Sequence, residues 1–292
     1  MTMVGPHSRV PVAKTYKIYI DGKFPRTESG RYFPLKDVDD QVVANLCRSS
    51  RKDFRNAVVS ARKAFPNWSS ASAYLRGQIL YRIAEMLEGR RDQFISELVL
   101  QGLSKRRARK EVEASIDRLI YFAGWSDKYQ QVFSAVNPVN SSHFNFSVLE
   151  PTGVVSILAP TGSGLLGLIS NIAPVIVGGN TSVILASESM PLCSVSFAEV
   201  LHASDVPAGV VNILTGFREE LTEQFATHMD VNAIIFSDDD GGVAKTIESL
   251  AANNIKRVIP RNAIDWSSEK NQNPYLIRDT QETKTTWHPI GN

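Results

Sequence analysis

The sequence predicts an α/β fold built on a parallel sheet flanked by helices. Between residues 153 and 259, short apolar runs alternate with stretches of helical apolar spacing, which is the pattern of repeated strand–helix–strand units. Residues 151–187 carry no charged side chain but contain turn sequences, which favours a buried strand and helix over a membrane span. The 292 residues, 43% of them hydrophobic, are enough for a large core.

The first half of the chain is predicted to open with a hairpin and to continue as a layer of helices. Residues 1–15 lack a long apolar core, so a flexible tail without a secretory signal is expected there. Residues 16–133 follow as one N-terminal part. The pair Asp21-Gly22 between β-prone flanks indicates a two-residue turn. Apolar residues at helical spacing then predict four helices, over residues 51–65, 75–87, 91–101 and 104–133.

The second half is predicted to contain an arm, a Rossmann-like core and a terminal piece. Residues 134–150 form the arm, because residues 143–150 alternate polar and apolar side chains as an antiparallel strand does. The core spans residues 151–262, and beyond it residues 263–292 are expected to be loop followed by a strand over 282–288. In the core, strands are predicted at 153–158, 182–185, 210–214, 232–236 and 256–259, and helices at 165–177, 194–202, 219–227 and 243–252.

Composition predicts neither a nucleic-acid partner nor a membrane partner. The formal net charge is only +2, and the basic run at residues 105–110 opens an amphipathic helix without interleaved aromatic residues, so we interpret it as a solvated helix face. The two cysteines, Cys47 and Cys193, have no metal-ligand or redox spacing and are interpreted as packing residues. A cytoplasmic location and no bound metal are expected.

Three consecutive aspartates, Asp238 to Asp240, follow an apolar run and precede a helix. In an open α/β sheet this position usually holds a phosphate. Two like charges about 5 Å apart repel by roughly 3 kcal/mol at an effective dielectric of 20. We therefore expect the triplet to exclude a pyrophosphate, while an aspartate there can also cap the helix.

Four segments, in order, resemble the NAD(P)-dependent aldehyde dehydrogenases: residues 150–155, 178–183, 206–216 and 228–236. Residues 19–24 and 121–125 fit the amino-terminal half of the same family. The resemblance implies the coenzyme-binding domain of that family together with a small antiparallel oligomerisation arm. It also implies NAD(P)-dependent oxidation of aldehydes as the family's activity.

The chain departs from the family at the positions to which the resemblance assigns catalytic and coenzyme-binding roles. Gly162 replaces the asparagine that donates to the oxyanion, and Arg261 lies nearest the general-base glutamate. Arginine cannot act as a base at neutral pH. The resemblance leaves five vestigial coenzyme-binding positions, of which the aspartates replace glycine and serine: Pro160, Glu188, Gly216, Asp238 and Asp239.

The resemblance places the family's thiol nucleophile in a separate catalytic domain that should follow residue 262. We expect that domain to be absent here, with the terminal piece directly following the coenzyme-type domain. No cofactor is expected, and NAD(P) would bind only if the degenerate site still accepts it. No catalytic residue is predicted.

The terminal piece resembles the final strand of the family's oligomerisation arm. The residues expected to mediate oligomerisation are Phe144, Phe146, Val148, Thr283, Thr285 and Trp287. The resemblance implies that this arm lies against the catalytic domain of a neighbouring subunit, which a second copy of this chain would not offer. The leading hypothesis is a non-catalytic structural or regulatory subunit that assembles with a full-length aldehyde dehydrogenase. Two alternatives are a residual nucleotide- or ligand-binding module using Glu188 and residues 162–164, and a weak oxidoreductase acting on aldehydes.

Overall fold

The computed structural model describes residues 12–237 and 242–291, and a five-stranded parallel sheet forms its centre. Its strands are β6 (Val154–Leu158), β7 (Thr181–Leu185), β8 (Val211–Leu214), β9 (Ala233–Phe236) and β10 (Arg257–Pro260). The spatial order is β10-β9-β6-β7-β8. From β6 the chain adds β7 and β8 on one side of β6 and then β9 and β10 on its other side. The direction of winding therefore reverses between β6 and β9. The predicted α/β fold class is confirmed.

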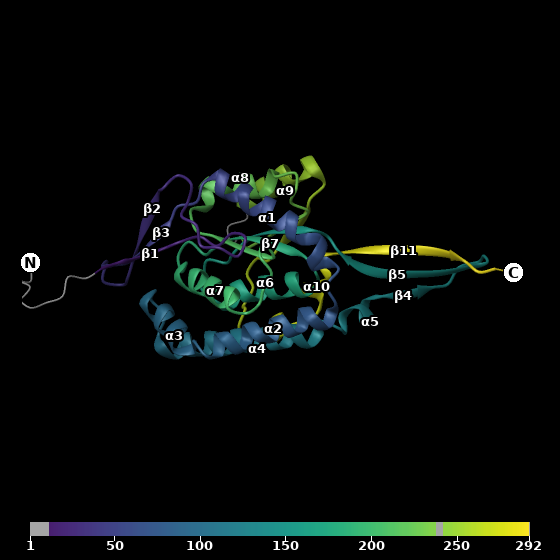
Figure 1. Cartoon of the computed structure of the whole chain (residues 1–292), viewed down its shortest axis with the longest axis horizontal. Coiled ribbons are helices and arrows are strands. Elements are labelled where there is room, and N and C mark those ends of the chain that lie inside the picture. The colour runs from purple at the N-terminus through teal and green to yellow at the C-terminus, as the bar shows by residue number, and fades with distance from the viewer. Residues whose placement is uncertain (1–11, 238–241, 292) are drawn as a thin grey trace, which may run out of the picture.

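Helices cover both faces of this sheet (Figure 1). One face carries α1 (Arg51–Ser69), α8 (Arg218–Thr227) and α9 (Gly242–Ala251). The other carries α2 (Ala73–Glu88), α3 (Arg91–Leu100), α4 (Lys105–Trp125), α6 (Leu166–Val177) and α7 (Leu192–His202). The two sets of buried side chains form separate apolar clusters, one on each side of the sheet.

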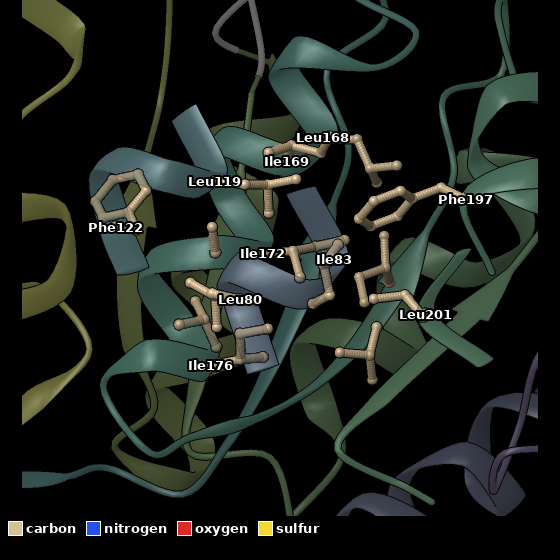
Figure 2. Close-up of a cluster of buried hydrophobic side chains, with 14 of the residues drawn as sticks. Leu80, Ile83, Leu119, Phe122, Leu168, Ile169, Ile172, Ile176, Phe197 and Leu201 are labelled. Atoms are coloured by element: carbon tan, nitrogen blue, oxygen red, sulfur yellow. The ribbon is translucent and has the colours of Figure 1, made fainter. Parts of the chain in front are cut away.

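Helix α6 is the inner helix of the thicker layer, and every one of its residues is buried. Apolar side chains from α2, α4 and α7 meet those of α6, as Figure 2 shows for Leu80, Phe122, Ile172 and Phe197. Strands β6 and β7 are also wholly buried. Burial of this whole strand–helix–strand unit explains why residues 151–187 carry no charge.

A second, antiparallel sheet projects away from the body (Figure 1). It contains β4 (Ala135–Asn137), β5 (His143–Pro151) and β11 (Gln281–Pro289), in the order β11-β5-β4. The register pairs Gln281 with Pro151 and Pro289 with His143, so β11 runs along the whole of β5. The antiparallel arm predicted for these two segments is present.

A third sheet was not predicted. It joins β1 (Lys14–Tyr16), β2 (Tyr32–Lys36) and β3 (Val42–Cys47) in the order β1-β3-β2. Strand β1 begins inside the range expected to be a flexible tail, because Lys14 and Thr15 pair with β3. The predicted Asp21-Gly22 turn is present, with reciprocal Ile20–Lys23 backbone hydrogen bonds of 3.0 Å, but its flanks form only isolated bridges.

The helix predicted over residues 104–133 is broken. Helix α4 ends at Trp125 and α5 (Tyr129–Phe133) follows after a turn. The turn brings Tyr129 into the core, where it is 1% exposed. Three further short pieces were not predicted: η1 (Ala252–Asn254), η2 (Glu269–Asn271) and α10 (Tyr275–Arg278).

Lys256 lies buried immediately before β10, which leads to a pH-dependent prediction. Its Nζ donates to the carbonyl oxygens of His228 (2.9 Å) and Val231 (2.7 Å), and burial lowers the Lys256 pKa from 10.5 to about 8. Between pH 8 and 10.5 the unfolded chain therefore holds a proton that the folded chain has released, so stability rises with pH through that window. Relative to Lys256→Met, the wild-type free energy of unfolding should gain up to about 3 kcal/mol across it.

Urea unfolding of both proteins at pH 7.5, 9 and 10.5 measures this difference. Parallel pH profiles for the wild type and Lys256→Met would contradict it.

Candidate functional site

The candidate site lies at the carboxyl ends of β6 and β9, where the strand order reverses. Ligands of open α/β sheets bind in the crevice at such a point. A cavity of about 630 Å³ lies there, lined by the start of α4, the loop after β6 and the segment after β10. Its volume is in the range typical of small-molecule sites, about 300–1,000 Å³.

The structure brings three of the sequence-predicted positions together around this cavity. Pro160 and Gly162 line it from the loop after β6, and Arg261 lines it from the end of β10. A Cβ atom at Gly162 would meet nothing within 4 Å, so there is room for a side chain at this position. Gly162 offers no side-chain donor, and Arg261 no base, to a group bound in the cavity.

The amino-terminal end of α6, which faces the cavity, already holds a carboxylate. Glu111 of α4 accepts hydrogen bonds through Oε1 from the Ser163 hydroxyl (2.8 Å) and from the amides of Leu165 (2.9 Å) and Leu166 (3.2 Å). Free amides at a helix start attract anions. Glu111 therefore caps α6 from a neighbouring helix, and no local sequence motif predicts this interaction.

Arg218, the first residue of α8, lies across the crevice itself. Its guanidinium donates to the carbonyl oxygen of Ala159, just after β6, and to that of Ser237 (2.9 Å), just after β9. The side chain thus joins the two strands at which the winding reverses. Sequence reasoning missed Arg218, because a single arginine at a helix start has no signature of its own.

Arg261 is fixed by the chain that follows it. Its Nη2 donates to Asp279 Oδ2 at 2.6 Å, and the side chain is 12% exposed. Arg257, at the other end of β10, pairs with Glu282 at 3.0 Å. Residues 261–280 are therefore tied back to the sheet and connect β10 directly to β11.

Of the remaining predicted coenzyme positions, Glu188 and Gly216 do not line the cavity. Glu188 is partly buried in the loop after β7. Gly216, after β8, has a φ of +153°, and a Cβ there would lie 3.4 Å from the backbone nitrogen of Ser49. Asp238 and Asp239 lie outside the described residues, directly after Ser237, which lines the cavity.

The described part of the chain places no thiol in the cavity lining. Cys193 is buried in α7, and burial raises the pKa of its thiol well above the usual value. A neutral buried thiol packs as a small apolar group, as predicted. Within residues 12–237 and 242–291, no cluster of three His, Cys, Asp or Glu side chains is arranged to hold a metal ion.

The six residues expected to mediate oligomerisation divide between two faces of the arm. In the β5–β11 register, Phe144 pairs with His288 and Phe146 with Thr286, whereas Thr285 pairs with Ser147 and Trp287 with Asn145. Directly paired residues share a face and successive residues alternate between faces. Phe144, Phe146 and Val148 therefore lie on one face of the arm, and Thr283, Thr285 and Trp287 on the other.

These two faces differ in chemistry. The apolar face carries Phe144, 45% exposed, and Val136 of β4, 68% exposed and paired with Phe146. The polar face is hydrogen-bonded within itself, since Ser147 accepts from Asn137 (2.9 Å) and lies 2.9 Å from the Thr285 hydroxyl. Trp287, 57% exposed, is the exposed aromatic residue of the polar face, but only the apolar face combines several partly or largely exposed apolar side chains from β4 and β5.

Comparison with known proteins matches residues 26–260 to the sequence model of the aldehyde dehydrogenase family. The chain is 30% identical over 249 residues to a putative aldehyde dehydrogenase, DhaS, of Bacillus subtilis (strain 168), covering 84% of this chain and 50% of that protein. It is 31% identical over 252 residues to the cytosolic 10-formyltetrahydrofolate dehydrogenase of Mus musculus, covering 83% of this chain and 28% of that protein. The chain thus spans half or less of the length of these relatives.

Solved structures agree with the sequence relatives. The fold is similar to an NAD+ complex of an aldehyde dehydrogenase from Bacillus cereus, with a TM-score of 0.81 and 25% identity over 85% of this chain and 51% of that one. It is also similar to PnpE from Pseudomonas sp. WBC-3, with a TM-score of 0.81 and 27% identity over the same shares of the two chains. No helix among the described residues is long and apolar enough to cross a membrane.

Proposed function

This chain belongs to the aldehyde dehydrogenase family, and we propose that it is a non-catalytic member that acts as a structural or regulatory subunit by assembling with a full-length aldehyde dehydrogenase. The family's coenzyme-type fold serves here as a scaffold that presents the β4-β5-β11 arm. A cytoplasmic location is part of this proposal.

The observation that carries the proposal is the position of Arg218. A dinucleotide bound in this fold lies across the crevice that the Arg218 guanidinium spans between Ala159 and Ser237. Displacing that guanidinium would leave two backbone carbonyl oxygens without their donor, which costs about 1–3 kcal/mol each when they are buried. The chain's own side chain therefore competes with a coenzyme for this place.

The absence of the family's catalytic groups at Gly162 and Arg261 also supports a non-catalytic role. Gly162 carries no oxyanion donor, and Arg261, held by Asp279, is no base. Residues 261–280 run from β10 to β11 without any counterpart of the domain in which the family keeps its nucleophile. Oxidation of an aldehyde through a thiohemiacetal and a thioester needs the thiol nucleophile, the oxyanion donor and the general base.

The arm supports the assembly part of the proposal. Its apolar face exposes Val136 and Phe144, next to Phe146 and Val148. Exposed side chains of this kind on a projecting sheet are typical of a surface that associates with another protein. In the family this arm reaches a neighbouring subunit.

Calorimetry with NAD, NADP and ADP tests the coenzyme part. The wild type should give no binding heat at millimolar ligand, because Arg218 and the Asp238–Asp240 run oppose a pyrophosphate. The variant Arg218→Ala/Asp238→Gly/Asp239→Ser should gain NAD binding, with circular dichroism checking that it folds. Saturable binding of NAD to the wild type would contradict the proposal and favour the alternative of a retained nucleotide-binding module.

A further inference from the structure

Helices α2 and α4 lie side by side on the outside of the thicker helical layer (Figure 1), and an open groove of about 370 Å³ lies between them. One wall is a face of α2 with Tyr74, Gln78 and Tyr81, and the other is a face of α4 with Ile120 and Gly124. These positions are three, four or seven residues apart, so on each helix they share a face. The lining includes no residue of the arm or of the crevice at β6 and β9.

The walls of this α2–α4 groove expose aromatic and apolar side chains. Tyr74 is 73% exposed and Tyr81 49%, and Ile120 on the facing helix is 43% exposed. Neither tyrosine hydroxyl forms a hydrogen bond with a residue in the described part of the chain. Exposed tyrosines are typical of recognition surfaces, since each offers an apolar ring and a polar hydroxyl.

The floor of the groove combines small residues with an unused hydroxyl. Ser126, in the turn after α4, is only 6% exposed, yet its hydroxyl forms no hydrogen bond with any residue that the structure describes. This hydroxyl lies against Gly77, where a Cβ atom would come within 2.5 Å of its oxygen. At Gly124, by contrast, a Cβ atom would meet nothing within 4 Å. An occupant of this open space can supply the acceptor that the Ser126 hydroxyl lacks.

The spacing of the two tyrosines matches a polyproline II helix. Tyr74 and Tyr81 are seven residues apart, which advances about 10.5 Å along the axis of α2. A polyproline II segment advances about 9.3 Å in three residues, so two prolines three apart reach both rings. Its carbonyl oxygens have no internal partners. Gln78 and Ser126 offer donors to them from within the groove.

The charges beside the groove leave one carboxylate uncompensated. The ion pairs Asp127–Lys128 (3.5 Å) and Arg82–Glu85 (3.0 Å) neutralise themselves. Asp117, which lies one turn earlier than the groove lining on the same face of α4, is exposed and forms no ion pair among the described residues. A carboxylate without a counter-charge favours an occupant that carries a cation.

We propose that the α2–α4 groove binds a proline-rich, basic segment of a partner protein in the polyproline II conformation. Two of its prolines lie against Tyr74 and Tyr81. Its carbonyl oxygens accept from Ser126 and Gln78, and a flanking arginine or lysine pairs with Asp117. The groove contains no part of the arm, so this proposal stands whether or not the chain assembles with a full-length aldehyde dehydrogenase.

Fluorescence anisotropy with three labelled peptides tests the class of ligand. The first has proline at every third position and a terminal arginine, the second has serine in place of each proline, and the third has glutamate in place of the arginine. The first should bind about tenfold or more tightly than either of the others, because only it matches both the ring spacing and the charge. Equal binding of the first peptide and either other one, or no binding of the first, would overturn the proposal.

Matched tyrosine variants test the residues. Tyr74→Ala/Tyr81→Ala should weaken binding of the first peptide about tenfold or more. The control Tyr32→Ala/Tyr275→Ala removes two tyrosines of similar exposure outside the groove and should change binding less than about twofold. Asp117→Asn should remove the preference for the arginine peptide over the glutamate peptide. Equal losses in the two double variants, or an unchanged preference in Asp117→Asn, would contradict the site.

A steric variant separates blocking of the groove from loss of the fold. In Gly124→Leu the new side chain enters the open space of the groove, so peptide binding should be abolished. Leucine is a better helix former than glycine, so the urea midpoint should stay equal or rise. Unchanged binding in this variant would contradict the location.

Sedimentation equilibrium tests a second copy of the chain as the occupant. The proposal predicts that Tyr74→Ala/Tyr81→Ala leaves the oligomeric state of the wild type unchanged. Self-association of the wild type that this variant abolishes would assign the groove to an interface between copies and overturn the proposal.

Discussion

Replacing Arg118 with methionine should lower the free energy of unfolding by about 3–4 kcal/mol. Arg118 of α4 is 2% exposed and has no carboxylate partner among the described residues. It donates instead to the Ser170 hydroxyl (2.6 Å) and to the carbonyl oxygen of Trp266 (3.0 Å), with longer bonds to residues 271 and 272. Methionine fills much of the volume but leaves buried acceptors unsatisfied, at about 1–3 kcal/mol each.

Arg109→Met is the matched control for this prediction. It is the same substitution on the same helix, but Arg109 is exposed and has no partner among the described residues. Its effect should stay within about 0.5 kcal/mol. Urea unfolding measures both variants, and equal midpoints would show that Arg118 does not hold residues 266–272 against the helices.

The double substitution Phe144→Asp/Phe146→Asp should prevent assembly with a full-length aldehyde dehydrogenase. Both phenylalanines are already partly buried, so covering their exposed parts contributes about 1 kcal/mol each and their loss weakens the complex by about 2 kcal/mol, roughly thirtyfold in affinity. The two carboxylates that replace them must in addition be desolvated. Size-exclusion chromatography of co-expressed chains measures the loss.

The opposite face of the arm supplies the control. Thr283→Asp/Thr285→Asp adds the same charge at two exposed threonines on the face that includes Trp287. Assembly should survive this change. If both double variants abolish assembly, or neither does, the assignment of the apolar face as the interface is wrong.

Much of the fold follows from apolar spacing in the sequence. The parallel strands and the helices that cover them lie within a few residues of their predicted positions, because β6, α6 and β7 are buried along their whole length. The sheet β1-β3-β2 was missed, since β1 pairs with a strand far along the chain and has exposed or partly exposed side chains. Such a strand has no alternation to detect.

The candidate site was predictable only in part. Motif positions located Pro160, Gly162 and Arg261, and the structure groups them around one cavity. Arg218, Glu111 and Arg118 were missed, because each acts on residues distant in sequence, such as Glu111 on Leu165 and Arg118 on Trp266. A charged residue whose partners are set by tertiary packing has no local pattern.

Native mass spectrometry tests the central claim most directly. The intact chain is co-expressed with a full-length aldehyde dehydrogenase of the same organism, and the complex is purified through a tag on this chain. The proposal predicts a mixed species of fixed stoichiometry containing both proteins. Only separate species of each protein, with this chain alone or paired with itself, would contradict it.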